Sequence, residues 1–579
     1  MKKIYLLTLL STVFIDVEAQ NFDWAKKGGL NAYDYGYGVT TDSAGNVYTA
    51  GRYEGNAEFS NVSIPNRGNF DIFFAKYSPT GAFQWVRSAG GYAGDYAEGI
   101  ACDNKNLYVT GVIEGTNEPI HFDGTPFILT TQGSSDIFVA KYTMEGALVW
   151  ARRAGGYDFD KSTGVAHDAA GNVYICGLFR GTATFGNNAM SITSLGNNDI
   201  FVAKYDAAGN FVWVRRAGSA GRDEAKSIAC DASGNVYITG LYSNGCHFGT
   251  QVLSSPGTYF NSFVAKYNTS GYLQWVHTGG GNYDDVGWSL ALDKSGHVFV
   301  TGEFNSGADF DNMSVYSAGM ADVFVGCYDV NGHLQWLRNA GGSLVDRARG
   351  ISYANNKVYI TGQFGGLAQF GTLSKKAVDS SDIFIAAMDM SGNFLWVTAA
   401  GGPADAPEGV GYESGNAVCG DENNNVYVTG AMLSGATFGS SNLTGFGHTD
   451  YFVCKLTPNP RLTRKQDHEP DTLADRTRDT LLSLGDAMRV QENLPDEKNL
   501  HLYPNPVQDH LTLELNFADD AFAGTMELQI VNMLGQVIET RALAPESSTV
   551  IDMSSRDKGI YFVHLRAGEK VLVKRIVVE

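Results

Sequence analysis

The residues best suited to chemistry are acidic side chains that recur along the chain at one fixed offset. Each stands five positions before the first apolar residue of a strand-like run, and the six aspartates are Asp34, Asp95, Asp160, Asp223, Asp285 and Asp346. A seventh copy departs from the pattern, because its loop is lengthened, carries Asp405 and places Glu413 at the equivalent offset. Carboxylate oxygens hold cations and polar ligands, and pairs of carboxylates serve as acid and base in glycan cleavage. The six aspartates are therefore the candidate ligand-binding residues.

A purely structural role fits the same aspartates. An aspartate at a turn accepts hydrogen bonds from the amides of its own loop, and catalysis requires an asymmetry that a residue repeated in every copy does not provide. A second series opens another strand in each copy, and we interpret it as structural: Asp71, Asp136, Asp199, Asp322, Asp382 and Asp450, with Asn261 in the remaining copy. For the first series both roles stay open.

Other catalytic and metal-binding patterns are missing from the sequence. It contains no H-E-x-x-H, G-x-S-x-G, P-loop or dinucleotide fingerprint, and its histidines are scattered without ligand spacing. We therefore expect no catalytic residue of these classes, no metal centre and no cofactor. Aromatic rings, however, stack on sugars, anchor protein partners or simply pack, and we expect such rings in the variable loops at Tyr33, Tyr35, Tyr37, Tyr92, Tyr96, Tyr157, Phe159, Tyr283 and Trp288.

The elements that position these residues belong to a repeat that occurs seven times. Its first mark is an aromatic residue followed three positions later by glycine, as in Tyr237 and Gly240, and its second is an aromatic strand such as residues 199–205. Its third mark is a tryptophan, with successive copies 60 to 65 residues apart: Trp24, Trp85, Trp150, Trp213, Trp275, Trp336 and Trp396. Three independent marks that each count seven exclude a chance similarity.

Each repeat contains four strand-like runs, which in the first copy are residues 38–42, 46–53, 71–77 and 82–87. The third run is apolar on both faces, as in a sheet stacked between neighbouring sheets. The fourth run carries arginine after its tryptophan, which suits an outer edge. We predict an all-β protein with a seven-bladed β-propeller over residues 20–458, whose loop carboxylates ring the mouth of a central channel.

Closure of the predicted ring involves the start of the chain. The first tryptophan run, residues 21–26, precedes any complete repeat, and the last aromatic strand, residues 450–456, is not followed by a tryptophan. Placing residues 21–26 as the fourth strand of blade seven supplies both missing partners and removes an open sheet edge. We therefore expect the N-terminal strand to close the propeller.

These strings resemble the bacterial propeller repeats known as SBBP or beta-propeller repeat proteins. The resemblance rests on the G-N-V-Y-x-x-G string at residues 234–240 and the D-x-F-x-A-K-Y string at residues 199–205, and it extends over roughly residues 21–458. It implies the fold and little about activity, because that family is functionally heterogeneous.

Export is indicated by the start of the chain and its charge. Residues 1–19 have the basic start, short apolar run and small-residue end of a signal peptide, with cleavage expected between Ala19 and Gln20. No other stretch approaches membrane length, so we expect no transmembrane segment. A net charge of −20 argues against nucleic acid as a partner. The seven cysteines include no C-x-x-C pair and are interpreted as small buried hydrophobic residues.

A charged linker is expected over residues 459–500 and a small β-sandwich domain over residues 501–579. The tail opens with Y-P-N-P, continues through an L-G-Q turn and a G-I-Y-F strand, and ends in basic residues. These strings resemble the type A C-terminal sorting domain of the type IX secretion system, through Tyr503, Pro504, Asn505, Pro506, Gly535, Gly559, Tyr561, Lys574 and Arg575. The resemblance implies a Bacteroidota protein that the type IX machinery, as a partner, exports through the periplasm to the outer-membrane surface or the medium.

Three functions remain open at this level. The first is a secreted or surface-displayed binding propeller, without enzymatic activity, that recognises a glycan or a surface protein. The second is a secreted glycan-active hydrolase or lyase that uses the loop carboxylates. The third is a structural module of the cell surface. The near-identity of the repeats favours binding or scaffolding over catalysis.

Overall fold

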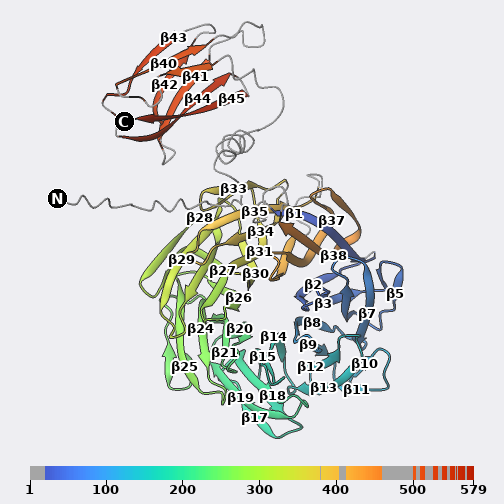
Figure 1. Cartoon of the computed structure of the whole chain (residues 1–579). Helices are drawn as coiled ribbons and strands as arrows, with labels where there is room; N and C mark the ends of the chain where they lie inside the picture. The colour runs from blue at the N-terminus through green and yellow to red at the C-terminus, as the bar shows by residue number, and fades with distance from the viewer. Residues whose placement is uncertain are drawn as a thin grey trace, which may run out of the picture. The chain divides into compact units, whose positions relative to one another are not determined.

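The computed structural model of this chain describes residues 20–30, 32–378, 380–402, 413–458, 500–503, 507, 509–515, 526–532, 537–543, 548–554, 556, 558–567 and 570–578. The predicted signal peptide with Ala19, residues 459–499 of the predicted linker and Asp405 lie outside the described residues. The chain divides into two compact units between Arg464 and Lys465. Every regular secondary-structure element in the described ranges is a β-strand, so the predicted all-β class is confirmed (Figure 1).

Each repeat of the first unit contributes strands to an antiparallel sheet, in which an innermost, a second, a third and an outer strand pair in that order. The innermost strands are β2 (Tyr35–Thr41), β8 (Tyr96–Cys102), β14 (Lys161–His167), β20 (Glu224–Cys230), β26 (Val286–Leu292), β30 (Arg347–Ala354) and β36 (Ser414–Gly420). The second strands are β3 (Val47–Glu54), β9 (Asn106–Glu114), β15 (Val173–Phe179), β21 (Val236–Tyr242), β27 (Val298–Phe310), β31 (Lys357–Phe364) and β37 (Val426–Phe438). Figure 1 shows these sheets side by side around a common centre, which the innermost strands face.

The outer half of each sheet completes the order. The third strands are β6 (Phe70–Tyr77), β12 (Ser135–Thr143), β18 (Asp199–Tyr205), β24 (Asn261–Tyr267), β28 (Met313–Tyr328), β34 (Asp382–Met388) and β38 (Ser441–Pro458). The outer strands are β7 (Phe83–Gly90), β13 (Leu148–Ala154), β19 (Phe211–Gly218), β25 (Leu273–Gly281), β29 (Leu334–Gly342), β35 (Phe394–Ala400) and β1 (Gln20–Gly29). The third strand is buried on both faces, since Ile137, Phe138 and Val139 are each at most 1% exposed.

The innermost strands begin earlier than the sequence predicts. In the first repeat β2 starts at Tyr35 and not at residue 38, because Tyr35 pairs with Arg52 at the end of β3. These additional residues include a β-bulge between Gly36 and Gly38. The bulge interrupts the alternation of apolar and polar residues from which a strand is predicted. Tyr35 and Tyr37, expected in a loop, therefore belong to a strand.

A short hairpin between the second and third strands covers the outer strand of the preceding repeat. Four of these hairpins are β4 (Ala57–Phe59) with β5 (Val62–Ile64), β10 (Pro119–Phe122) with β11 (Ile128–Thr130), β22 (Cys246–Phe248) with β23 (Gln251–Leu253), and β32 (Leu367–Phe370) with β33 (Leu373–Lys376). Their first strands pair with β1, β7, β19 and β29, and the long strand β27 pairs in the same way with β25. The hairpins thus occupy part of an edge that would otherwise be open to other chains.

Close approach of the hairpin explains the glycines that end the outer strands. A Cβ atom on Gly279 would lie 2.0 Å from the ring of Phe310, which stands opposite it across the β25–β27 pairing. Between β13 and the hairpin of β16 (Thr182–Phe185) and β17 (Met190–Thr193), Gly155 and Thr184 form an isolated bridge, and a Cβ on Gly156 would lie 2.0 Å from Thr182 O. Only glycine permits this backbone contact.

In the repeats of Trp150, Trp213 and Trp336, the outer tryptophan and the arginine two residues after it bond to the next repeat. Trp150 Nε1 donates to Ala207 O at 3.3 Å and Arg152 Nε donates to Gly209 O at 2.8 Å, both in the turn between the third and outer strands of the following repeat. The Arg152 guanidinium also lies over the Trp150 ring, 5.4 Å from its centroid. The arginines that the sequence assigned to an outer edge therefore also join neighbouring sheets.

Strand β1 is the hydrogen-bonded neighbour of β38, from Gln20 opposite Pro458 to Gly28 opposite Tyr451. Trp24, on this strand, is 6% exposed, and its Nε1 donates to Pro79 O at 3.2 Å in the first repeat. This contact is equivalent to that of Trp150 with Ala207. The start of the chain thus makes the same two kinds of contact as any other outer strand.

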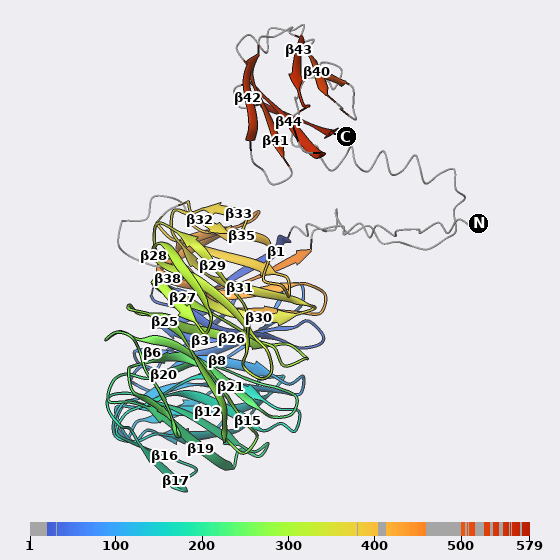
Figure 2. The same cartoon turned by 90° about the vertical axis from the view of Figure 1, so that its left-hand side faces the viewer.

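The second unit consists of two antiparallel sheets. One contains β39 (Leu500–Tyr503), β40 (His510–Leu515) and β43 (Ser548–Asp552), and the other contains β42 (Val537–Leu543), β41 (Met526–Asn532), β44 (Gly559–Ala567) and β45 (Lys570–Val578). Both contribute to one buried core, with Leu511 and Ile551 from the first sheet and Ile530, Val563 and Ile576 from the second. Figure 2 shows the two sheets as separate layers.

The contacts of Trp24 generate a stability prediction. Because Trp24 is as buried as Trp150 and bonds the next turn in the same way, Trp24→Ala is expected to lower the free energy of unfolding by about 3–5 kcal/mol, as Trp150→Ala does. Deletion of residues 21–29 is expected to destabilise the first unit at least as much. Denaturant unfolding of the three variants measures this, with Val212→Ala as a control because Val212 is 49% exposed. Unchanged unfolding after Trp24→Ala or the deletion, beside a destabilised Trp150→Ala variant, would refute the expectation.

Candidate functional site

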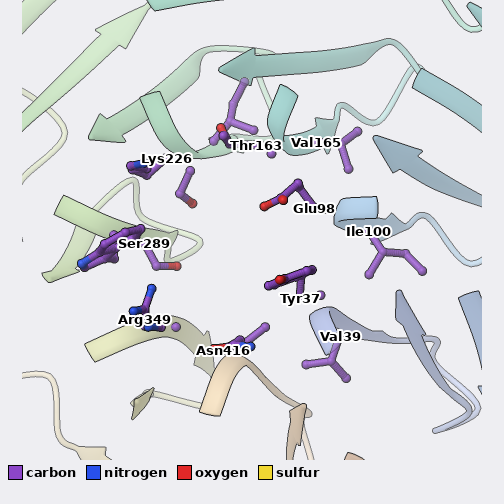
Figure 3. Close-up of a pocket in the computed structure, with 18 of the residues that line it drawn as sticks. Tyr37, Val39, Glu98, Ile100, Thr163, Val165, Lys226, Ser289, Arg349 and Asn416 are labelled. Carbon is purple, nitrogen blue, oxygen red and sulfur yellow. The ribbon is translucent and has the colours of Figure 1, made fainter. Parts of the chain in front are cut away.

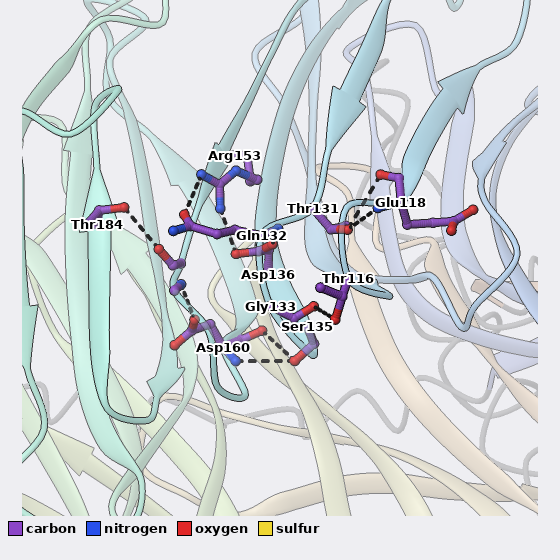
Figure 4. Close-up of polar contacts among 12 residues, drawn as sticks. Thr116, Glu118, Thr131, Gln132, Gly133, Ser135, Asp136, Arg153, Asp160 and Thr184 are labelled. Carbon is purple, nitrogen blue, oxygen red and sulfur yellow. Dashed lines mark hydrogen bonds and ion pairs between the residues drawn. The ribbon is translucent and has the colours of Figure 1, made fainter.

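The six candidate aspartates lie inside the first unit and not on its surface. Each is at most 1% exposed: Asp34, Asp95, Asp160, Asp223, Asp285 and Asp346. In the third repeat Asp160 (Figure 4) accepts from Gly156 N at 2.7 Å with one oxygen. Its other oxygen accepts from Arg180 N at 3.2 Å. The other five accept amide bonds at the same two offsets, four residues before and 19 or 20 residues after the aspartate. Each carboxylate therefore joins the loop before its strand to the end of the second strand.

The second aspartate series lies beside the first. A Cβ on Gly155 would lie 2.3 Å from Asp136 Oδ1 and 2.9 Å from Asp160 Oδ2, so two carboxyl groups flank this one glycine. Asp136 accepts from Gln132 N at 2.5 Å and forms an ion pair with Arg153 at 2.8 Å (Figure 4). Burial, followed by the nearby Asp136 carboxyl, raises the pKa of Asp160 to about 8, although its amide donors act in the opposite direction.

These contacts favour the structural role of the candidate aspartates. Their oxygens accept bonds from the protein's own amides, as Asx turns do, and are not exposed at a channel mouth. Glu413 fits the same pattern in the seventh repeat, because it is 3% exposed and accepts from Gly402 N at 3.0 Å. The longer glutamate side chain preserves the bond to the loop despite the lengthened segment.

A different set of residues is brought together at the centre of the first unit. Every innermost strand has a β-bulge at the same position, and the bulged residues are Tyr37, Glu98, Thr163, Lys226, Trp288, Arg349 and Asn416. A bulge adds one residue to a strand and redirects its side chain. All seven bulged side chains line a single cavity of about 500 Å³, the channel. Figure 3 shows Tyr37, Glu98, Lys226 and Arg349 around this space, each from a different strand.

Small residues beside each bulge allow the innermost strands to approach one another. A Cβ on Gly99 would lie 3.2 Å from Gly164 Cα in the next repeat, and a Cβ on Gly350 would lie 3.0 Å from Ala417 Cα. The sequence therefore carries a small–x–small pattern in each repeat, at residues 36–38, 97–99, 162–164, 225–227, 287–289, 348–350 and 415–417. Sequence reasoning singled out two of the central residues, Tyr37 and Trp288, as loop aromatics and missed the other five, although the pattern was visible in every repeat.

Charge in the channel is mainly positive. Of the residues that line it, Arg52, Lys161, Lys226 and Arg349 are cationic and Glu98 is anionic. Lys161 forms an ion pair with Glu98 at 2.7 Å. The Lys226 ammonium lies 2.5 Å from a Glu224 oxygen that is itself buried. Burial acts to raise the pKa of Glu224, but the Lys226 and Arg222 cations outweigh this effect and lower that pKa to about 2.

Trp288 lies in the wall of the channel between two cationic side chains. The Arg349 guanidinium carbon lies 4.7 Å and the Lys226 ammonium 4.9 Å from the Trp288 ring, and such contacts contribute about 0.5–2 kcal/mol each. The indole is held in place because its Nε1 donates to Glu303 at 3.3 Å, while Glu303 also pairs with Arg347. Trp288, expected in a loop, is thus a fixed part of β26.

A second aromatic group surrounds Arg52. Its guanidinium carbon lies 4.6 Å from the Tyr35 ring, 4.5 Å from Phe70 and 4.6 Å from Tyr96. The Arg52 Nε atom is buried and has no hydrogen-bond partner among the described residues. Tyr96, like Tyr37, lines the channel from a strand and not from a loop. The loop tyrosines Tyr92, Tyr157 and Tyr283 are 81%, 77% and 51% exposed.

The residues of the sorting signal are described in part. Pro504, Asn505, Pro506 and Gly535 lie outside the described residues. Tyr503 ends β39, Gly559 begins β44, and Lys574 and Arg575 lie in β45. Tyr561 in β44 is 7% exposed and belongs to the core of the second unit.

Comparison with known families supports both resemblances. Residues 501–579 match the family described as a secretion system C-terminal sorting domain, and residues 212–249 match a beta-propeller repeat. The sorting domain indicates export by the type IX system to the cell surface or the extracellular space. A beta-propeller repeat indicates a binding or scaffold role.

Individual relatives are distant. The chain is 24% identical over 232 residues to an uncharacterized WD repeat-containing protein of Acanthamoeba polyphaga mimivirus, a match that covers 34% of this chain and 17% of the relative. It is 28% identical over 143 residues to the regulatory protein FlaEY of Caulobacter vibrioides, covering 24% of this chain and 15% of the relative. The chain thus spans less than a fifth of the length of either relative.

Solved structures are also dissimilar in detail. A mutant puromycin hydrolase bound to PGG aligns over 70% of this chain and 59% of its own, with 10% identity and a TM-score of 0.31. A Bacteroides thetaiotaomicron protein of unknown function aligns over 72% of this chain and 98% of its own, with 11% identity and a TM-score of 0.23. Scores this low carry no functional conclusion.

No group of three or more His, Cys, Asp or Glu side chains in the described part of the chain is arranged to hold a metal ion. Nor does that part contain a helix long and apolar enough to cross a bilayer.

The buried aspartates predict how stability depends on pH. Burial raises the pKa of Asp34 and Asp160 to about 8 and that of Asp285 and Asp346 to about 7, against about 3.9 in an unfolded chain. A raised pKa means that folding takes up a proton, so its contribution is complete below about pH 4 and is lost as the pH rises through 7 to 8. We expect the free energy of unfolding to increase between pH 8.5 and 6, by up to about 1.4 kcal/mol per pH unit for each carboxyl group.

Denaturant unfolding at pH 6, 7 and 8.5 measures this dependence. Asp346→Asn removes one titrating group and should make the dependence shallower, whereas substitution of the exposed Asp309 by Asn should leave it unchanged. A stability that stays level or increases from pH 6 to 8.5 would show that the buried aspartates are ionised.

Proposed function

We propose that the first unit is a closed ring of seven four-stranded blades, with β1 as the outer strand of the seventh. Three observations at the junction support closure: β1 pairs with β38, Trp24 bonds Pro79, and Asn416 Nδ2 donates to Gly36 O at 2.9 Å. The last bond joins the innermost strand β36 to β2 and so spans the junction on the channel side.

Within this ring, we propose that the channel of an exported protein binds a glycan. The observation that carries the proposal is that the seven bulged residues differ from one another, although they stand at one position of the repeat. A symmetrical framework with one unlike residue per blade provides the asymmetry that a specific ligand requires. The volume of about 500 Å³ lies within the range of about 300–1,000 Å³ typical of small-ligand sites.

The chemistry of the lining supports a sugar. Trp288, Tyr37 and Tyr96 contribute aromatic rings to the lining, and aromatic rings are groups against which the apolar side of a sugar packs. Thr163 and Asn416 add hydroxyl and amide groups that both donate and accept hydrogen bonds. Aromatic faces combined with a few fixed polar groups are what a carbohydrate site requires.

The enzymatic alternative receives less support from the site. Hydrolysis of a glycoside requires an acid and a second carboxylate some 5–9.5 Å apart across the bond. The candidate aspartates are bonded to backbone amides, and Glu98, the carboxylate among the channel-lining residues, is paired with Lys161. A binding module therefore accounts for the site better than a hydrolase or lyase. Incubating a bound polysaccharide with the protein and measuring released products distinguishes the two.

A glycan array and titration calorimetry with the full chain test binding in the channel. Trp288→Ala removes the aromatic face and is expected to weaken binding about 10-fold or more, since stacking of an aromatic ring contributes about 1–2 kcal/mol. Tyr272→Ala provides the control, because Tyr272 is 64% exposed in the turn that joins β24 to β25, away from the channel lining. Equal effects of the two substitutions, or no bound glycan, would contradict the proposal.

The tail predicts the route of export. In a bacterium with a type IX system, the full chain is expected at the cell surface or in the medium, and a chain that lacks residues 501–579 is expected to remain in the periplasm. Fractionation followed by immunoblotting measures this, and the full chain in a strain without the translocon is the matched control. Surface delivery of the truncated chain would show that residues 501–579 are not the export signal.

A further inference from the structure

The channel contains two cationic side chains, Arg349 and Arg52, that no carboxylate of the described residues contacts directly. Lys161 is paired with Glu98 and Lys226 with Glu224. Among the described residues, neither Arg349 nor Arg52 has a hydrogen bond or a close ion pair, and their guanidinium groups lie over aromatic rings. The Glu303 carboxylate acts on Arg349, and Glu114 interacts with Arg52, without direct contact. In a chain of net charge −20 this local excess of positive charge is unusual. It marks the channel as a place for negative charge.

The two arginines are also partly withdrawn from water. Arg349 is half-buried against Trp288, and the Nε atom of Arg52 is buried without a partner among the described residues. Holding a guanidinium in such a place without an anion costs free energy that a bound anion would recover. The fork of N–H donors on arginine matches the two oxygens of a carboxylate or sulfate group.

Aromatic and cationic groups coincide at Trp288. Arg349 and Lys226 both lie within 5 Å of its ring centroid, so an anionic group that reaches them lies beside the indole face. The indole cannot easily turn away, because Glu303 holds its Nε1. A ligand that satisfies the whole cluster must therefore carry a ring to stack and an acidic substituent next to it.

We propose that the channel recognises an acidic sugar, a ring that bears a carboxylate or sulfate group, with the ring against Trp288 and the anionic group on Arg349 and Lys226. This inference rests on the proposed function, since it names the class of glycan that the same channel binds. It also assigns Arg349 as the residue that distinguishes acidic from neutral sugars.

The experiment compares acidic and neutral sugars on the full chain. A glycan array that contains uronate-bearing, sulfated and neutral oligosaccharides identifies the class, and calorimetry with a uronate disaccharide and its neutral counterpart measures the affinities. Arg349→Gln is expected to weaken binding of the acidic sugar about 10- to 100-fold, with Arg349→Lys intermediate because it keeps the charge and loses the fork. Affinity should also fall as sodium chloride is raised.

Arg338→Gln is the matched control. Arg338 also lies over a tryptophan, with its guanidinium carbon 5.7 Å from the Trp336 ring, but it belongs to the outer strand β29. Its removal should leave the affinity for the acidic sugar unchanged. Thermal unfolding of each variant shows whether a loss of binding reflects a loss of structure, and Arg349→Lys keeps the test decisive if Arg349→Gln does not fold.

The outcomes separate the inference of an acidic sugar from the broader proposal that the channel binds a glycan. Preference for acidic sugars that depends on Arg349 supports both, and the uronate and sulfate arms show which anionic group is bound. Equal binding of neutral sugars that depends on Trp288 and not on Arg349 overturns this inference and leaves the proposed function standing. Inorganic sulfate competing as strongly as the acidic sugar overturns the assignment to a saccharide. No binding, or binding that no channel substitution alters, overturns both.

Discussion

The antiparallel pairing of β1 with β38 is the interaction on which the rest of the first unit depends. It brings together strands from the two ends of the first unit, so the pairing must offset the entropy of closing a long loop of chain. The junction still differs from the other interfaces in one respect. Trp396 Nε1 is buried without a partner among the described residues, because β38 and β1 are not joined by a turn like those whose carbonyl groups accept from Trp150 and Trp213.

Most of the distinctive positions of the repeat stabilise the stacked sheets, whereas one position has no such structural role. The aspartates, the outer tryptophans and the glycines under the hairpins bond or pack against neighbouring backbone, so the same residue type is needed in each copy. The bulged residue of the innermost strand has no such partner in common. Its side chain points into the channel, where Tyr37, Trp288 and Arg349 stand at equivalent positions. The position that varies from repeat to repeat is therefore the one that lines the channel.

How far the sequence predicts this arrangement depends on what leaves a periodic signal. The all-β class, the repeat and the sorting domain follow from strings that recur or extend over many residues. The candidate site did not follow from the sequence, because an aspartate's burial and its bonds to backbone amides leave no mark in the sequence. A buried aspartate such as Asp160 and an exposed, ligand-binding aspartate look the same there. The bulge at Tyr37 also broke the alternation that locates a strand, which placed Tyr37 and Trp288 in loops. Their small neighbours, such as Gly36 and Gly38, carried the missing signal.

The central claim is that the channel, and not the loop surface, is where this exported protein meets its ligand. An experimental structure of the full chain with an acidic oligosaccharide bound tests it most directly. The account predicts density for a sugar ring against Trp288, with its acidic group within hydrogen-bond distance of Arg349. Density for the sugar on exposed loop tyrosines such as Tyr92 and Tyr157, with no sugar among the bulged residues, would contradict it.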